Sequence, residues 1–252
     1  MSRWGSSIWR WVVDFVCPPT CLACGESIQA GGCLCASCFS ALHFIVAPCC
    51  QRCGEPLSAY EVADDGQGVC AACQQYPPLW QRARAAFVYN DMARRLIFPL
   101  KYSDRPGHAA FLATFMEEAA RELLQPGVVV IPVPLHVKKL RKRRYNQAGL
   151  LAFHLARKQH VNVLFDGLYR RQNTRSLAHL PVAERKEELH NMFGVKACYH
   201  ARLKGKHVVL VDDILTTGAT AEACSRALLD IGCSKVDIIV AARACAGHTV
   251  LT

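Results

Sequence analysis

Hydrophobic and polar positions divide the chain into three parts with different patterns. Residues 1–16 place large apolar side chains at helical spacing, which predicts an amphipathic helix with Trp4, Ile8, Trp11, Val12 and Phe15 on one face. Residues 17–76 hold few large apolar side chains and cannot build a hydrophobic core by themselves. Residues 82–252 alternate short apolar runs with helical patterns, which is typical of an α/β domain.

The third part has a regular alternation of strands and helices. Its apolar runs predict strands at 128–133, 161–165, 208–211 and 236–241. Its helical stripes predict helices at 112–123, 148–155 and 219–231. Strands that are apolar on both faces and separated by helices form mostly parallel sheets covered on both faces. A proline-containing stretch before this part, QQYPPLWQR, is interpreted as a linker.

Cysteines are concentrated in the second part of the chain. Four C-x-x-C pairs occur there, and a glycine follows directly after two of them. Two such turns can surround one ion with four thiolates, as in a closed structural zinc site. We expect two zinc sites, with the pairs grouped in sequential order: Cys21, Cys24, Cys35 and Cys38 at one site, and Cys50, Cys53, Cys70 and Cys73 at the other. An interleaved grouping, or Cys49 in place of Cys50, stays open.

Other uses of these cysteines depend on the cellular compartment. The apolar run at the N-terminus is interrupted by Arg10 and Asp14 and has no small-residue cleavage site, so it does not resemble an export signal. No run approaches the ~18 apolar residues of a membrane span. We therefore expect a cytoplasmic protein with reduced thiols, which favours metal over disulfides. The N-terminal helix packs on the protein or makes a weak contact with the inner membrane face or a partner.

Charge points to anionic partners. The formal net charge is +10, and six cations crowd into seven positions: Lys138, Lys139, Arg141, Lys142, Arg143 and Arg144. This basic run has three interpretations, namely a solvated face, a neighbour of a bound diphosphate, and a track for a nucleic-acid backbone.

The stretch VVLVDDILTTGAT, residues 208–220, carries the most specific chemistry. Asp212 and Asp213 follow a buried strand, and ligands of α/β sheets bind at this end of the strands. The following turn leads into a helix whose unpaired N–H groups favour a phosphate. Carboxylates would repel that phosphate, but they can accept hydrogen bonds from sugar hydroxyls. The pattern therefore indicates a phosphorylated pentose, such as a ribose 5-phosphate.

This stretch resembles the motif of type I phosphoribosyltransferases that binds phosphoribosyl pyrophosphate (PRPP). Together with the cysteine pairs, LKYSDR and IPVPLHVKKLRKRRYNQ, the layout is similar to the ComF family (competence protein F), which joins a double zinc ribbon to a phosphoribosyltransferase domain. The resemblance implies magnesium with PRPP, and it assigns Asp212 and Asp213 to the ribose. It assigns Lys101 and the turn to the ligand, and Pro132 to Leu135 to the pyrophosphate loop. The turn residues are Thr216, Thr217, Gly218, Ala219 and Thr220.

The resemblance also implies a role in DNA uptake and in handling single-stranded DNA during natural transformation, with the uptake machinery as a partner. The family's Gly-Phe pair is replaced here by Arg144 and Tyr145, and Leu177 and Glu188 stand where the family has Gln and Asn. These changes lie on the pyrophosphate and acceptor sides. They favour PRPP binding over the alternative, an active phosphoribosyltransferase in which Asp212 and Asp213 stabilise a cationic sugar and an unidentified acceptor attacks.

Overall fold

The computed structural model describes residues 18–58, 68–102, 107–171 and 192–245. The helix predicted over residues 1–16 lies outside the described residues, as do Leu177 and Glu188. No helix in the described part of the chain is long and apolar enough to cross a membrane.

A parallel sheet forms the centre of the described structure. Five strands pair in the order β1-β7-β6-β2-β3, and every neighbouring pair is parallel. Their bounds are Ala83–Val88 (β1), Val129–Pro132 (β2), Asn162–Val163 (β3), His207–Leu215 (β6) and Lys235–Arg243 (β7). The predicted parallel α/β sheet is confirmed.

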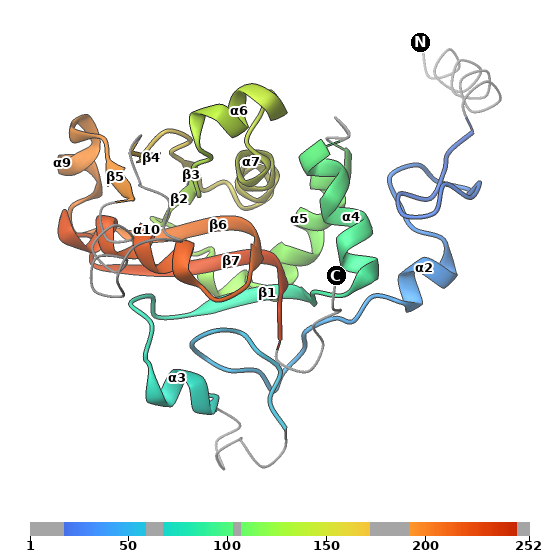
Figure 1. Ribbon diagram of the computed structural model, residues 1–252, viewed down its shortest axis with the longest axis horizontal. Coiled ribbons are helices and arrows are strands. Elements are labelled where there is room, and N and C mark those ends of the chain that lie inside the picture. The colour runs from blue at the N-terminus through green and yellow to red at the C-terminus, as the bar shows by residue number, and fades with distance from the viewer. Residues whose placement is uncertain (1–17, 59–67, 103–106, 172–191, 246–252) are drawn as a thin grey trace, which may run out of the picture.

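Helices cover both faces of this sheet (Figure 1). Successive strand residues point to opposite faces, so Val209 and Val211 on β6 pack in one core and Val208 and Leu210 in the other. The first core takes its helical side chains from α4 (Asp91–Tyr102), α5 (Gly107–Ala119) and α7 (Gln147–Gln159). The second core is covered by α10 (Ala219–Asp230).

Shorter elements connect the strands of the sheet and its long helices. The basic run forms α6 (Val137–Arg143), which has no buried side chain. A two-stranded antiparallel ribbon pairs β4 (Leu168–Arg170) with β5 (Phe193–Val195). The remaining short elements are η2 (Arg121–Leu123), η4 (Ala197–Tyr199) and α9 (His200–Leu203).

The cysteine-rich arm consists of two small knuckles that contact different parts of the α/β unit. The first knuckle, residues 18–40, includes α2 (Ala36–Ser40), and the second, residues 48–58 and 68–76, includes α3 (Ala71–Gln75). In Figure 1 α2 lies near α4, whereas α3 lies apart from it, beneath the sheet. Between the knuckles, Phe44 contacts Phe87 of β1 and Phe115 of α5, with ring centroids 5.1 and 5.4 Å apart.

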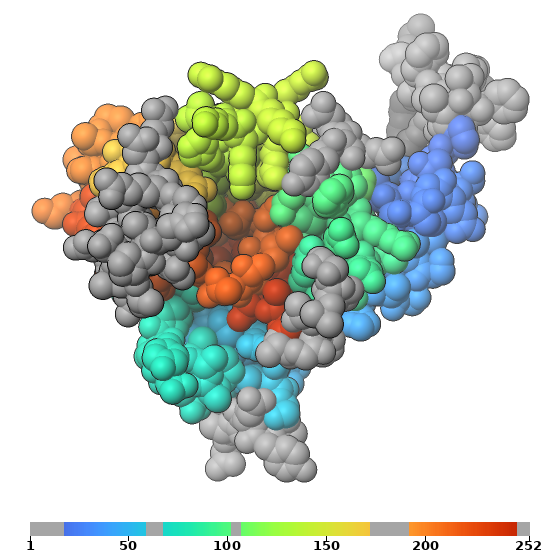
Figure 2. Space-filling model, viewed as in Figure 1, coloured from blue at the N-terminus to red at the C-terminus, as the bar shows by residue number. Residues whose placement is uncertain are grey.

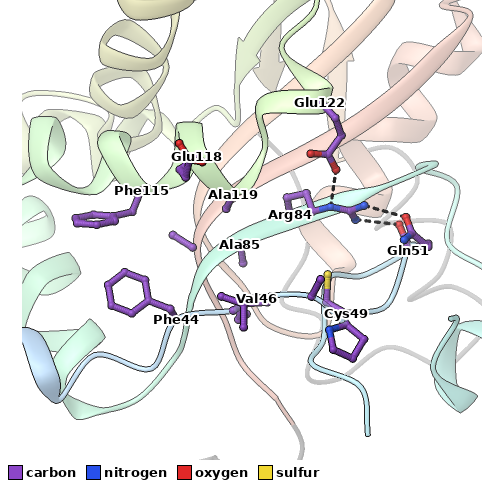
Figure 3. A pocket seen from close by; sticks show the side chains of 15 residues that line it. Phe44, Val46, Cys49, Gln51, Arg84, Ala85, Phe115, Glu118, Ala119 and Glu122 are labelled. Carbon is purple, nitrogen blue, oxygen red and sulfur yellow. Dashed lines mark hydrogen bonds and ion pairs between the residues drawn. The ribbon is translucent and has the colours of Figure 1, made fainter. Parts of the chain in front are cut away.

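Arg84 on β1 attaches the second knuckle to the sheet (Figure 3). Its guanidinium donates to Glu122 Oε1 at 2.8 Å and to Gln51 Oε1 at 2.9 Å. A cavity of about 420 Å³ lies beside this contact, and the residues predicted to form the ligand site do not line it.

The stretch interpreted as a linker is more than a connection. Trp80 is buried, with 5% of its surface exposed, and it belongs to the second core of the α/β unit. The interpretation was incomplete because the partners of Trp80 come from residues far away in the sequence.

Candidate functional site

Asp212 and Asp213 lie near the end of β6, and both are half-buried. The backbone N–H of Asp213 donates to Asp212 Oδ1 at 2.8 Å. Lys101, near the end of α4, places its Nζ atom 2.8 Å from Asp213 Oδ2. The structure therefore brings the predicted lysine, which lies more than a hundred residues away in the sequence, to the acidic pair.

Burial and the neighbouring charge act on Asp212. Removal from water, followed by the negative charge of Asp213, raises the pKa of Asp212 to about 8, although the positive charge of Lys101 opposes the rise. Asp212 therefore carries a proton through most of the neutral range when no ligand is bound. A hydroxyl donor forms a stronger hydrogen bond with the ionised carboxylate, so binding of such a ligand favours loss of that proton.

The turn after β6 is exposed where a phosphate would approach it. Thr216, Thr217, Ala219 and Thr220 are exposed, and α10 begins at Ala219. Gly218 adopts a φ of 83°, and a Cβ atom there would lie 2.7 Å from Cη2 of Trp80. Only glycine fits both conditions, because other residues strain at this φ and carry the atom that would clash.

These side chains surround one small crevice. A cavity of about 60 Å³ is lined by Val133, by Asp212 and by the turn residues from Thr216 to Thr220. In Figure 2 the orange and red ends of β6 and β7 lie in a hollow that is bordered by α6 and α7 in yellow-green and by α4 in green. Asp212, which is predicted to bind the sugar, and the turn, which is predicted to bind the phosphate, are therefore neighbours in space.

The predicted pyrophosphate loop, Pro132 to Leu135, lies beside the acidic strand. The N–H of Val133 donates to the carbonyl of Val211 at 2.9 Å. Asn146 donates from Nδ2 to the carbonyl of Val133 at 2.9 Å, and its Oδ1 caps α7 by accepting the N–H of Ala148 at 3.1 Å. Asn146 therefore positions this loop from behind.

Arg243, at the end of β7, was not predicted as part of the site. Its guanidinium donates to the carbonyls of Leu215 at 3.1 Å and of Thr216, and so holds the start of the turn from below. The one signal in the sequence was a charged residue at the end of an apolar strand, and many surface positions share that signal.

The cysteine sulfurs gather in two groups that match the sequential grouping. Within each group the four sulfur atoms lie within 4.8 Å of one another. The Sγ atoms of Cys24 and Cys35 are 3.7 Å apart, and those of Cys53 and Cys70 are 3.6 Å apart. A tetrahedral zinc ion with Zn–S bonds of about 2.3 Å needs sulfurs about 3.8 Å apart. Both groups therefore fit zinc, and among the described residues Cys49 belongs to neither.

Comparison with protein families separates the same two parts of the chain. Residues 12–74 match a double zinc ribbon domain, and residues 173–249 match a phosphoribosyl transferase domain. The two cysteine clusters support zinc in the first of these domains.

Curated relatives resemble the chain over most of its length. "DNA utilization protein YhgH" of Shigella flexneri is 32% identical over 67% of this chain and 75% of its own. "Competence protein F" of Haemophilus influenzae is 28% identical over 69% and 78%, and "Competence protein ComFC" of Bacillus subtilis is 28% identical over 79% of each chain. With its double zinc ribbon and its phosphoribosyltransferase-type domain, the chain belongs to the ComF family.

Proposed function

We propose that this protein binds PRPP or a related ribose 5-phosphate ligand, with magnesium, in a role associated with DNA uptake. The observation that supports the proposal most directly is the crevice in which Asp212 and the turn from Thr216 to Thr220 line one cavity. Asp212 can accept hydrogen bonds from hydroxyl groups, and the turn can bind an anion. The two lie close enough together for one phosphorylated pentose to contact both.

Each part of the ligand has a matching group. The 5-phosphate would accept hydrogen bonds from the hydroxyls of the turn and from N–H groups of the first turn of α10, where the helix dipole also favours an anion. The ribose hydroxyls would donate to Asp212 and Asp213. Magnesium, when bound with PRPP, would supply positive charge to the pyrophosphate beside the loop that begins at Pro132.

The association with DNA rests on the relatives and on charge. The matched relatives are named for competence and for DNA utilization. The exposed cations of α6 directly follow the predicted pyrophosphate loop, so a single-stranded DNA backbone could run along α6 next to the crevice. We extend the proposal to a contact with single-stranded DNA and with the uptake machinery.

Calorimetric titration of PRPP with magnesium tests the binding site. We expect the wild type to bind and Asp212→Asn/Asp213→Asn to lose about 10- to 100-fold in affinity for each carboxylate, since a hydrogen bond to a charged group contributes about 1.5–3 kcal/mol. Asp166→Asn is the matched control, because Asp166 is an exposed carboxylate that pairs with Lys196 and does not line the crevice. Equal affinity in all three proteins contradicts the proposal.

Phosphoribosyl transfer is the alternative for the same site. Labelled PRPP incubated with a panel of nucleobases separates the two, because transfer releases pyrophosphate and binding alone does not. Arg144 and Tyr145 replace the family's Gly-Phe pair near this side of the site. We therefore expect binding without release of pyrophosphate.

A further inference from the structure

Trp80 joins the second knuckle to the phosphate-side turn. Its ring lies against Gly218, so closely that a Cβ atom on Gly218 would sit 2.7 Å from Cη2. Its Nε1–H donates to the carbonyl of Arg52 at 2.8 Å. Arg52 belongs to the C-x-x-C-G turn between Cys50 and Gly54, so one side chain contacts both a zinc-ligand turn and the candidate phosphate turn.

Arg243 and Glu55 make a second connection between these two turns. Arg243 holds the carbonyls of Leu215 and Thr216 from below, and its Nη2 lies 3.9 Å from Glu55 Oε2. Glu55 directly follows the C-x-x-C-G turn, and its carbonyl accepts the N–H of Cys50 at 2.7 Å. The side chains of Arg243 and Glu55 are mostly buried, with 14% and 21% of their surface exposed, so solvent screens this contact only partly.

A third connection reaches the helix that begins at the turn. The N–H of Leu79, next to Trp80, donates to Glu222 Oε2 at 3.0 Å. Glu222 lies in the first turn of α10. The three connections start in the second knuckle or in the segment that follows it. They reach Gly218 in the turn, Arg243 at the end of β7, and Glu222 in the first turn of α10.

The first knuckle makes different contacts. Its Phe39 packs on Phe44 and Phe115, with ring centroids 5.4 and 6.1 Å apart, on the α5 side of the molecule. Its partly buried side chains pack on the first core, the one opposite α10. The two cysteine sites therefore allow a direct comparison. Both have four cysteines, but only the knuckle of the second site is connected to the candidate phosphate turn by these contacts.

Zinc is what fixes the conformation of the second knuckle. Apart from the four cysteines, its cluster includes only the partly buried Leu57 and Val69 among the described residues. Both Cys53 and Cys70 direct their N–H groups at Cys50 Sγ, at 3.5 and 3.4 Å, as is expected around a metal-bound thiolate. A knuckle with so little apolar burial depends on its metal for a defined structure.

We infer that the second four-cysteine site is a positioning element of the phosphate-side turn, acting through Trp80, Arg243 and Glu55. Zinc at this site, and not at the first, sets the affinity of the crevice for a ribose phosphate. This inference rests on the proposed function, because it concerns the same crevice. Gly218 gives the turn wide backbone freedom, and the three connections restrict that freedom before a ligand arrives.

The test compares one variant at each zinc site of the full-length protein. Ribose 5-phosphate is titrated calorimetrically into the wild type, Cys53→Ser and Cys24→Ser, after the zinc content of each protein is measured. We expect Cys53→Ser to lose one zinc ion and to weaken binding by about 10- to 100-fold, the effect of a small misplacement of binding groups. Cys24→Ser should also lose one zinc ion but keep its affinity within about twofold of the wild type.

Trp80→Phe separates positioning from unfolding. This variant removes the N–H that reaches Arg52 and leaves all eight cysteines in place, so it should retain both zinc ions and bind ribose 5-phosphate about tenfold more weakly. Hydrogen exchange should be faster at the amides of residues 216–219 in Trp80→Phe, but unchanged in Cys24→Ser.

The outcomes distinguish the two proposals. A wild type that does not bind ribose 5-phosphate would refute the proposed function itself. A wild type that binds, together with Cys53→Ser and Trp80→Phe proteins of wild-type affinity, would overturn the positioning role alone. If Cys53→Ser does not fold, Trp80→Phe decides the question.

Discussion

Lys101 and Asp213 form an ion pair next to Asp212, with Lys101 Nζ 2.8 Å from Asp213 Oδ2 and 21% and 13% of their side-chain surfaces exposed. The pair connects α4 to the end of β6. It also places a positive charge next to two carboxylates that would otherwise repel each other. Lys101 therefore offsets part of the negative charge of the acidic pair.

Replacing Lys101 by methionine keeps the length of the side chain and removes its charge. We expect Lys101→Met to bind PRPP at least about tenfold more weakly at pH 7.5, because an ionised hydrogen-bond partner is removed. The pKa of Asp212 should also rise above that of the wild type, because the charge of Lys101 lowers it. Calorimetry at several pH values measures both effects, and an unchanged affinity would show that Lys101 has no part in the site.

The pKa of Asp212 predicts how binding depends on pH. Burial, followed by the charge of Asp213, raises the pKa to about 8. Ribose hydroxyls donate stronger hydrogen bonds to the ionised carboxylate than to the protonated carboxyl. Affinity for ribose 5-phosphate should therefore increase as pH rises from 7 to 9, by up to about tenfold per unit below the pKa. The phosphate is already a dianion in this range, since its second pKa is about 6.

Asp212→Asn provides the control for this pH dependence. The variant has no proton to release at this position, so its weaker binding should be flat between pH 7 and 9. A wild-type affinity that falls with pH over the same interval would mean that Asp212 binds the ligand in its protonated form.

The sequence predicted the parts of the fold that depend on local apolar patterns. The strands expected at 208–211 and 236–241 are the cores of β6 and β7. Each extends further, because pairing between the two strands continues through Asp212 with Val240 and through Ile214 with Ala242. The sequence did not predict this extension, because Asp212 and Asp213 interrupt the apolar run of β6. Only the pairing with β7 identifies these residues as part of the strand. β1 was missed because Arg84 and three alanines make a weak apolar run.

Sequence analysis predicted those residues of the site that lie next to one another in the sequence. The acidic pair and the turn lie within one stretch, and the structure places Asp212 and the turn around one crevice. Arg243 and Trp80 act on that stretch from distant elements, through backbone carbonyls or through packing on a glycine. Neither kind of contact leaves a residue pattern, so sequence reasoning could not identify them.

Asp237 offers a test of stability away from the crevice. It is fully buried, accepts the N–H of Arg82 at 2.9 Å, and lies 2.9 Å from His207 Nε2. Burial by itself would raise its pKa, but the hydrogen bond from His207 and the nearby positive charges outweigh burial and lower it. Asp237→Asn should lower the free energy of unfolding at pH 7 by roughly 1.5–3 kcal/mol in urea titrations.

The sign of the pH effect follows from the lowered pKa. Ionised Asp237 stabilises the protein above its unfolded-state pKa of about 3.9, and this contribution is lost as pH falls through the lower folded-state value. The stability difference between the wild type and Asp237→Asn should therefore shrink below about pH 4. Asp166→Asn, which removes an exposed ion pair, should change stability by less than about 1 kcal/mol at any pH.

Removal of zinc should unfold the knuckles and spare the sheet. Chelation should release two zinc ions per chain, because the sulfurs form two four-membered groups. Circular dichroism should then keep most of the helix signal, since the longer helices lie in the α/β unit. Cys49→Ser is the control and should retain both ions. Knuckles that stay protected from protease after both ions are removed would contradict a structural role for the metal.

The exposed cations of α6 predict a salt-dependent contact with single-stranded DNA. Lys138, Lys139, Arg141 and Lys142 are exposed on this helix. If they follow a DNA backbone, replacing all four by glutamine should weaken binding of an oligonucleotide. It should also reduce the slope of log affinity against log salt by about 0.7 for each phosphate that the variant no longer neutralises.

Lys204 and Lys206 supply the matched comparison for α6. Both are exposed, and they precede β6, at the end of the strand opposite Asp212. Replacing these two by glutamine lowers the net charge without touching α6, so it should leave the slope nearly unchanged. If each cation removed from α6 and each cation removed from Lys204 and Lys206 reduces the slope equally, DNA binding depends on the total charge of the protein and not on a track along α6. Fluorescence anisotropy across a salt series separates the two results, because a track loses slope only where its own cations are removed.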